Sequence, residues 1–267
     1  MAAAAKRALE LTCFGVGEGW PCSDRRHSSF LYSIGGAHIL VDAGEGLSSA
    51  YKASGRSYEQ VDRVLLSHLH SDHVGSLSMW FQGLWLEGRR RPLAVSAPAG
   101  GIDPIRNWLE ATLLFPDLIR FPVSWEAIDP RQPVQCGDVR IQAFPTTHLE
   151  SLRRSFQAKN PRGVFDCFSF VFEHEGLRVG HSSDIGDVND LEPLLQAPLD
   201  LLVCELSHVS PAELFLKLRG RSIGRLVFVH LSRELWAERT ALKSQARRAL
   251  GSAIPVSVAG DGGVFRI

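Results

Sequence analysis

Short apolar stretches closed by glycine, proline or polar turns recur along the whole chain. Continuous or alternating apolar residues over such lengths predict β-strands. In the first half of the chain the predicted strands are Leu9–Phe14, Phe30–Ile34, His38–Val41, Val61–Leu66 and Leu93–Ala97. In the second half they are Val139–Phe144, Phe168–Glu173, Leu177–Gly180, Leu199–Cys204, Leu226–Val229, Val256–Ala259 and Val264–Ile267. The pair Gly35-Gly36 predicts a tight hairpin between two of the early strands.

Three segments carry a helical pattern instead. Leu77, Trp80 and Leu84 recur near a helical period. Pro104–Leu114 is a second predicted helix with its proline in the first turn, and Glu234–Leu250 is a third, basic one. Strands fill both halves and helices follow them. This order predicts an α/β fold in which two mixed sheets pack face to face with helices on both outer faces.

The composition is that of a chain with a substantial core. Of its 267 residues 45% are hydrophobic and 22% are charged, and no repeat, low-complexity tract or linker interrupts them. We therefore expect one domain over residues 9–267 and a flexible N-terminus over residues 1–8. Acidic and basic side chains number 29 each, so no net charge attracts nucleic acid to the whole surface.

Cysteine usage and the lack of long apolar runs indicate a cytoplasmic protein. The five cysteines form no Cys-x-x-Cys pair, and several lie in apolar stretches, as reduced, buried thiols do. No segment is long and apolar enough for a membrane span or a signal peptide, so we expect no membrane partner.

The loop after the predicted strand Val61–Leu66 carries the strongest chemical signal. It holds His68, His70, Asp72 and His73 in front of a predicted helix. Imidazole nitrogen and carboxylate oxygen suit zinc, iron and manganese, and alternation along the loop can direct the first two histidines to one ion and the other two donors to a second. The alternative is a polar capping loop with incidental histidines. It is less favourable because several ionisable groups would be buried together without a metal.

Two metal ions need more donors than one loop supplies. His148, Asp184 and His230 each stand where a predicted strand ends and the chain turns. Functional side chains collect at such places because the strand fixes their direction and the loop exposes them. Taken singly, each is more often an ordinary histidine or a turn aspartate, so their order along the chain has to decide.

The order and spacing of these motifs resemble the metallo-β-lactamase superfamily and, within it, the ribonuclease Z-like branch. The resemblance spans almost the whole chain and is carried by four segments before residue 101. They are the glycine-rich turn Gly15-x-Gly17-x-Gly19-x-Pro21, the acidic motif Val41-Asp42-Ala43-Gly44-Glu45-Gly46, the signature His68-x-His70-x-Asp72-His73 and the proline-flanked strand Pro92–Gly100. His148, Asp184 and His230 stand in for the later motifs.

The resemblance implies an αββα sandwich with a site for two divalent metal ions along one edge. The implied ligands of the first ion are His68, His70 and His148, and those of the second are Asp72, His73 and His230, with Asp184 bridging the two. Zn²⁺ is the first candidate, and Mn²⁺ and iron are alternatives. Asp42 is either a group that steadies the histidine loop or a turn-forming aspartate.

Paired ions can share a hydroxide that attacks the substrate, and the leaving group then needs a proton. In ribonuclease Z-like enzymes a glutamate pairs with a histidine near the leaving oxygen, and Glu205 resembles that glutamate. His208 is its candidate partner, although the two are only three residues apart, closer than in the family. Imidazole titrates near neutrality and suits a proton donor. The alternative for His208 is a loop histidine without a chemical role, whereas Asp72 would serve both metal binding and catalysis.

Three hypotheses about activity remain open. The first is a dinuclear metal-dependent phosphodiesterase that acts on a small or generic phosphodiester. The second keeps the site but hydrolyses a lactone, a carboxylic ester or a β-lactam. It gains weight if the apolar segment Trp80–Leu86 lines a pocket, although core packing explains that segment more simply. The third is a metal-binding regulatory protein without turnover, which the complete donor set disfavours.

RNA stays open as a substrate, but no insertion resembles the arm with which transfer-RNA-processing members of the branch grip RNA. The segment Ser151–Phe165 holds four basic and no acidic side chains, namely Arg153, Arg154, Lys159 and Arg162. It follows a predicted ligand and can cover the site, where arginine suits a phosphate. The basic runs at 89–91 and 217–225 are expected to be solvated.

Two further expectations concern the surface. The resemblance implies a homodimer, for which the apolar helix after the signature is the candidate interface. Of the remaining histidines, we expect His181 on a surface turn, with a place behind the metal ligands as the alternative. We expect His27, His38 and His174 at exposed positions or strand edges without a chemical role.

Overall fold

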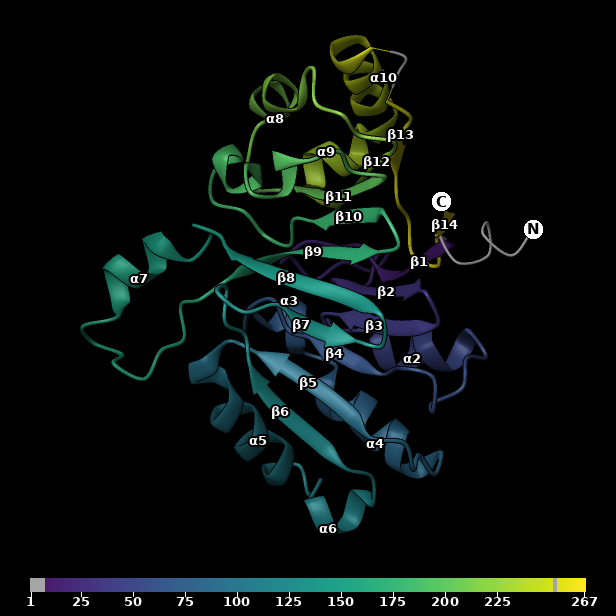
Figure 1. Cartoon of the computed structure of the whole chain (residues 1–267). Coiled ribbons are helices and arrows are strands. Elements are labelled where there is room, and N and C mark those ends of the chain that lie inside the picture. The colour runs from purple at the N-terminus through teal and green to yellow at the C-terminus, as the bar shows by residue number, and fades with distance from the viewer. Residues whose placement is uncertain (1–7, 252–253) are drawn as a thin grey trace.

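Two β-sheets packed face to face form the centre of the computed structural model, which describes residues 8–251 and 254–267 (Figure 1). The first sheet consists, in spatial order, of β14 (Val264–Arg266), β1 (Leu9–Gly15), β2 (Ser29–Ile34), β3 (Ala37–Val41), β4 (Arg63–Leu65), β5 (Leu93–Ala97) and β6 (Val123–Ala127). The second consists of β13 (Val256–Val258), β12 (Leu226–Leu231), β11 (Leu201–Leu206), β10 (Leu177–His181), β9 (Phe168–His174), β8 (Val139–Pro145) and β7 (Val134–Cys136). The flexible N-terminus expected over residues 1–8 lies outside the described residues, except for Ala8.

The two halves of the chain repeat one pattern of strand pairing. β1, β2 and β3 are antiparallel neighbours, and β3 through β6 run parallel. In the same way β8, β9 and β10 are antiparallel neighbours, and β10 through β13 run parallel. Both sheets are therefore mixed, and within each sheet the loops that follow the parallel strands leave at one edge.

Alternate residues of the strands face alternate layers, as the period of two requires. In β2, Tyr32 faces the layer between the sheets and Leu31 faces the outer helices. In β11, Val203 faces the layer between the sheets and Leu202 faces the helices on the other side. Three apolar layers result, one between the sheets and one under each set of helices.

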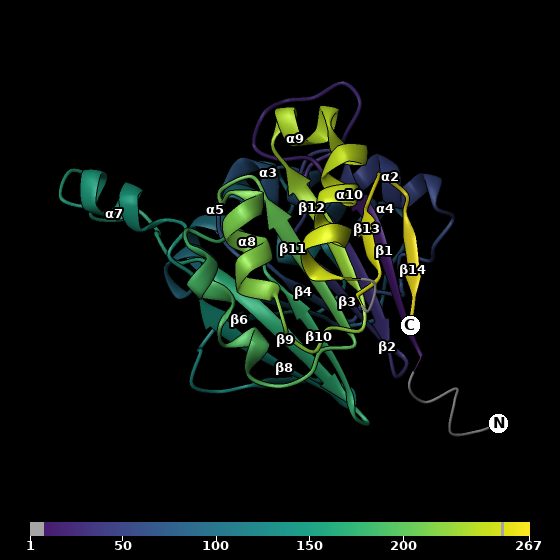
Figure 2. The ribbon, with the colours of Figure 1, turned by 90° about the horizontal axis from the view of Figure 1, so that it is seen from above.

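Helices cover the outer face of each sheet (Figures 1 and 2). The first sheet is covered by α2 (Leu47–Ala53), α4 (Leu77–Leu86), α5 (Ile102–Ala111) and α6 (Pro116–Ile119), and the second by α8 (Pro211–Leu218) and α10 (Arg239–Leu250). This arrangement confirms the predicted αββα sandwich of two mixed sheets. Each helix in the described ranges is too short or too polar to span a lipid bilayer.

Equivalent hairpins join β2 to β3 and β9 to β10. Gly35 and Gly36 have φ values of 55° and 84°, and Glu175 and Gly176 have φ values of 44° and 79°. Such pairs of positive φ give the tight turn whose twist matches that of the strands. Gly35 also needs its missing side chain, because a Cβ there would lie 2.5 Å from the ring of His174.

The differences from the predicted elements fall mainly at strand and helix ends. β11 and β12 continue to Leu206 and Leu231, so Glu205 and His230 lie within strands instead of after them. Both strands are buried on both faces, and a continuous apolar run does not mark where such a strand ends. The predicted helix Pro104–Leu114 is α5, which begins two residues earlier and ends at Ala111.

Other elements depart further from the prediction. The predicted helix Glu234–Leu250 is two helices, α9 (Arg233–Ala237) and α10, because Glu238 leaves the helical conformation at φ −99° and ψ 18°. β6 and β7 are short, partly exposed strands, and α2 and α8 are short helices. None of these four gives a pattern long enough to identify it from the sequence.

The apolar helix α4 belongs to the core. Trp80 and Leu84 have no exposed surface and pack between this helix and the first sheet. Core packing therefore accounts for Trp80 and Leu84, as expected. Phe81 of the same segment also lines an apolar pocket, formed with α5, α6 and β6 and without the predicted metal ligands. Met79 and Leu86 are the large apolar side chains that this helix exposes.

Candidate metal centre

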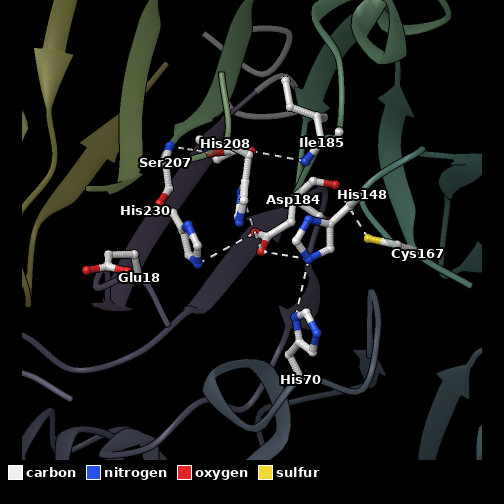
Figure 3. A network of polar contacts seen from close by, with 12 residues as sticks. Glu18, His70, His148, Cys167, Asp184, Ile185, Ser207, His208 and His230 are labelled. Carbon is white, nitrogen blue, oxygen red and sulfur yellow. Dashed lines mark hydrogen bonds and ion pairs between the residues drawn. The ribbon is translucent and has the colours of Figure 1, made fainter. Parts of the chain in front are cut away.

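Seven histidine and aspartate side chains meet at the edge of the sandwich where parallel strands of both sheets end. Figure 3 shows four of them, His70, His148, Asp184 and His230. The first half supplies four of them from the loop after β4 and from the short helix α3 (Ser71–Val74), namely His68, His70, Asp72 and His73. The second half supplies three from three separate strands, namely His148 after β8, Asp184 after β10 and His230 in β12. The structure thus brings together all the side chains that the sequence proposes as ligands.

Three ring nitrogens and one carboxylate oxygen form a first cluster. His70 Nδ1 lies 3.1 Å from His68 Nε2 and 3.2 Å from His148 Nε2. Asp184 Oδ2 lies 3.8 Å from His68 Nε2 and 3.5 Å from His148 Nε2. These atoms surround one point, and they are the nitrogen and oxygen donors that divalent first-row ions prefer.

A second cluster shares Asp184 with the first. Asp184 Oδ1 lies 3.3 Å from His73 Nε2 and 3.6 Å from His230 Nε2. Asp72 Oδ2 lies 3.4 Å from His73 Nε2 and 3.2 Å from His230 Nε2. The carboxylate of Asp184 therefore turns one oxygen toward each cluster, which is the arrangement of a bridging group.

Asp42, at the end of β3, fixes the orientation of two of these rings. Its buried carboxylate accepts hydrogen bonds from Ser67 N at 2.8 Å, from Ser67 Oγ at 2.9 Å and from His73 Nδ1 at 2.7 Å. Because Ser67 Oγ donates to Asp42, it accepts from His68 Nδ1 at 3.0 Å. The ring of His68 thus carries a proton on Nδ1 and presents the lone pair of Nε2 to the clusters. In His73 the hydrogen bond from Nδ1 to Asp42 leaves Nε2 as the atom that would coordinate a metal ion. With φ at 61°, Asp42 turns the chain as well as steadying the loop.

The donor set fits metal ions. In the described part of the chain, His73 Nε2 and Asp184 Oδ1 are buried and have no hydrogen-bond partner. Burial holds the pKa of His68 well below its usual range and lowers the pKa of His148 to about 4, so these rings offer lone pairs at neutral pH. Burial alone would raise the pKa of Asp184, but the neighbouring His230 and His73 hold it well below its usual range. Converging lone pairs beside an ionised carboxylate favour a cation between them.

His230 reaches the site through a β-bulge. Between β11 and β12, Glu205 pairs with Val229 and Leu206 pairs with Leu231, so His230 is the extra residue. Its φ of 48° is unusual for a residue with a side chain. Bulges re-aim side chains beside active sites, and here the bulge directs the imidazole to the second cluster.

Asp190 ties together the two loops that carry His148 and Asp184, and sequence reasoning missed it. Its Oδ2 accepts hydrogen bonds of 2.9 Å from Thr147 N, Thr147 Oγ1 and Gly186 N. These donors flank the two candidate ligands in the sequence. The signal that points to Asp190 is the capping box between positions 187 and 190.

A carboxylate–imidazole pair lies beside both clusters. Glu205 is buried and accepts a hydrogen bond of 2.9 Å from His208 Nδ1 and three more from backbone N–H groups. The ring of His208 packs against His148, with centroids 4.4 Å apart, and stacks on His230 at 5.6 Å. Burial alone would lower the pKa of His208, but Glu205 and Asp184 raise it to about 9. His208 therefore carries a proton at neutral pH.

Three other histidines are placed differently from the expectation. His181 is buried at the end of β10, not on a surface turn, and its Nδ1 lies 2.7 Å from the hydroxyl of Tyr32. Burial lowers the pKa of His181 to about 3 and raises that of Tyr32, so the hydroxyl donates to a neutral ring. His27 and His174 are buried as well, because each packs against a glycine turn of a neighbouring segment.

The basic segment Ser151–Phe165 forms α7 (Glu150–Phe156) and a return loop that stand out from the sandwich (Figures 1 and 2). Arg153 is engaged locally, because its guanidinium donates to Phe165 O at 2.7 Å and to Asp166 at 2.8 Å. The segment faces His70 across a groove. The expectation that the run at 89–91 is solvated is wrong for Arg89, which is buried because its guanidinium donates to backbone carbonyls. Lys217 and Arg221 pair with Glu192.

Sequence comparisons find a matching family and several relatives of this chain. The model of a family described as "Beta-lactamase superfamily domain" matches residues 37–250. A ribonuclease Z of Bradyrhizobium diazoefficiens is 29% identical over 168 residues, which cover 63% of this chain and 51% of that protein. A ribonuclease Z of Pyrococcus abyssi is 28% identical over 159 residues, which cover 59% and 51%. The chain thus spans about half the length of these relatives.

Solved structures show the same fold over nearly the whole chain. The metallo-β-lactamase fold protein YhfI of Bacillus subtilis superimposes with a TM-score of 0.76 at 20% identity, over 98% of this chain and 100% of that one. The short form of human tRNase Z superimposes with a TM-score of 0.70 at 18% identity, over 96% and 98%. Together with the sequence relatives, these similarities confirm the fold and the ribonuclease Z-like resemblance.

Proposed function

This chain belongs to the β-lactamase superfamily, and we propose that it is a dinuclear metal-dependent phosphodiesterase of the ribonuclease Z-like type. Its substrate is a small or generic phosphodiester. The observation that carries this proposal is the position of Asp184, with one carboxylate oxygen toward each of two donor clusters. Similarity to proteins named ribonuclease Z supports phosphodiester chemistry at that site.

Two divalent ions would occupy the clusters. The first would be held by His68, His70, His148 and Asp184, and the second by Asp72, His73, His230 and Asp184. When bound, such ions activate water as a nucleophile near neutral pH and stabilise negative charge on the phosphoryl oxygens. Zn²⁺ is our first choice because the donors are mainly imidazoles, with Mn²⁺ and iron as alternatives.

The protein's own groups orient the reactants and move a proton. Asp72 and Asp184 stay ionised beside the histidines and accept hydrogen bonds from the attacking water. Protonated His208 donates to the leaving oxygen, since it lies at the edge of both clusters and is partly exposed. Glu205 is a positioning residue that holds the ring of His208 and stabilises its charged form.

We place the enzyme in the cytoplasm. All five cysteines are free thiols, and four of them are buried, as expected in a reducing compartment. A homodimer through α4 remains a prediction. The exposed Met79 and Leu86 give that helix an apolar outer edge. Sedimentation at the mass of a single chain would remove the dimer without affecting the proposed reaction.

Side-by-side assays test the activity. Protein loaded with Zn²⁺ or with Mn²⁺ is given bis(4-nitrophenyl) phosphate, an aryl acetate, a lactone and a cephalosporin. We expect turnover of the phosphodiester, its loss on chelation and its return on adding metal. Turnover restricted to the carbonyl substrates would replace the proposal with ester, lactone or β-lactam hydrolysis. Metal binding without any turnover would point to a regulatory protein.

A further inference from the structure

An apolar groove opens beside the candidate metal centre on the His70 side. Its volume is about 490 Å³, and it lies between the loop after β4 and the segment that carries α7. The side chains that make it apolar are Leu69, Pro104, Leu152, Phe156, Val164 and Phe165. Since His70 also lines it, a ligand in the groove would be continuous with one bound at the metal centre.

The α7 wall of this groove is unusually apolar for a projecting segment. Leu152 is 39% exposed and Phe156 is 49% exposed, and no residue of α7 is buried. Exposed apolar side chains that gather around a concave surface mark a binding site more often than scattered ones do. A ligand bound in the groove would therefore cover apolar side chains of α7 that are otherwise exposed to solvent.

A cation lines the same groove. Arg162 has no hydrogen-bond or ion-pair partner among residues 8–251 and 254–267, whereas Arg153 in the same segment is bound to Asp166. A guanidinium at the rim of an apolar groove favours a ligand that combines an apolar body with a negative charge.

The position of the groove decides which part of the substrate it receives. Figure 3 shows His70 and His208 on opposite sides of Asp184. His208 is the proposed proton donor, so the leaving group faces that side. The other ester group, which stays on phosphorus after cleavage, then faces His70 and the groove.

We propose that this groove binds the retained ester group of the phosphodiester, and that this group is aromatic or aliphatic and carries a negative charge. The inference rests on the proposed phosphodiesterase function and specifies its substrate class. A bare methyl ester would leave the groove empty.

Three phosphodiesters with the same 4-nitrophenyl leaving group test the proposal, with methyl, phenyl or carboxyphenyl as the retained group. The test variant is Phe156→Ala, supported by Leu152→Ala. Leu216→Ala is the matched control, because this apolar side chain on α8 is 69% exposed and lies outside the groove. In Phe156→Ala we expect the ratio of phenyl to methyl kcat/KM to fall by about tenfold. Comparing ratios removes the intrinsic reactivity of each ester.

The charge is tested separately. Arg162→Gln should lower the ratio of carboxyphenyl to phenyl kcat/KM by about threefold, as expected for a partly exposed charge pair. Arg154→Gln is the control, since this exposed arginine belongs to α7 but does not line the groove. Unchanged ratios in Arg162→Gln would remove the requirement for a negative charge.

Binding without turnover separates this inference from the proposed function. Calorimetry measures the affinity of metal-loaded protein for phenylphosphonate and for methylphosphonate, and so tests binding in the groove even if no ester is cleaved. We expect tighter binding of phenylphosphonate to the wild-type protein, and loss of that preference in Phe156→Ala and Leu152→Ala. Equal binding of the two phosphonates, or a preference that survives both variants, would overturn the groove proposal. Absence of ester turnover with the preference intact would overturn only the phosphodiesterase.

Discussion

The N-terminal and C-terminal halves of this protein pair their strands in the same pattern but build the candidate site differently. In the first half, four donors lie within six residues of one loop. In the second half, His148, Asp184 and His230 come from three strands. The first half therefore concentrates its chemistry in one segment, and the second half depends on the whole sheet to bring its donors together.

Two aspartates in corresponding loops make the contrast sharper. Asp42 directly follows β3, and Asp184 is the third residue after β10, the counterpart of β3 in the second sheet. The carboxylate of Asp42 accepts hydrogen bonds from Ser67 and His73, whereas that of Asp184 turns one oxygen to each cluster. The loops after corresponding strands thus supply an aspartate that orients ligands in one half and one that is itself a candidate ligand in the other.

Replacing the shared carboxylate should have the largest effect. In Asp184→Ala both clusters lose an oxygen donor. Losing a proton donor alone typically lowers the rate by about 10²–10⁴-fold, and we expect a larger fall in kcat/KM for phosphodiesters here. Elemental analysis of the purified variant should find less than the full metal content. Near-normal activity in a variant with full metal content would show that Asp184 does not join the two clusters.

Replacing His208, the proposed proton donor in the second half of the chain, should have the second-largest effect. His208→Gln should slow cleavage of an alkyl leaving group by about 10²–10⁴-fold, and of 4-nitrophenolate much less, because a good leaving group needs no proton. Glu205→Gln should act in the same direction, since it leaves His208 in place without its carboxylate partner. Equal losses for both leaving groups, or a loss of metal in His208→Gln, would contradict the assigned role.

The orienting aspartates of the two halves allow a direct comparison. Asp42→Asn and Asp190→Asn should each weaken metal affinity by about 10–100-fold, because groups that orient ligands have effects of this size. Competition with a chelating dye measures the affinity. Asp103→Asn is the control, since the side chain of Asp103 on α5 is 85% exposed. An effect of Asp42→Asn no larger than that of the control would mean that the hydrogen bond to His73 does not matter.

The smallest effect is on stability and comes from the layer between the sheets. The folded protein holds the pKa of His181 at about 3, below its ordinary value of 6.5, so the unfolded chain binds this proton more readily. The contribution of His181 is therefore complete above pH 6.5 and is lost as the pH falls from 6.5 to 3, by about 1.4 kcal/mol per pH unit. When the pH falls from 7 to 5, the free energy of unfolding should therefore decrease by about 2 kcal/mol less in His181→Gln than in the wild type. Identical pH profiles in denaturant titrations would contradict this assignment.

The sequence predicts the first half of the site better than the second. The donors on one loop can be recognised from their spacing alone, because burying His68, His70 and His73 together is unfavourable without a metal ion. His148, Asp184 and His230 look ordinary until their order is compared with a family. His230 in particular depends on a bulge in register with Glu205, which only the pairing of β11 with β12 creates.

Features that depend on packing between distant segments could not be predicted from the sequence. Asp190 orients two loops through donors some forty residues apart in the chain, and the burial of His181 depends on Tyr32 from the other sheet. The groove on the His70 side is assembled from α7 and the loop after β4. Apolar periodicity reports how one element is buried, not which separate elements meet.

Anomalous X-ray diffraction from crystals of the metal-loaded protein tests the central claim most directly. The account predicts two peaks, one among His68, His70 and His148 and the other among Asp72, His73 and His230, with Asp184 between them. A single peak, or peaks away from Asp184, would contradict a site built jointly by the two halves of the chain.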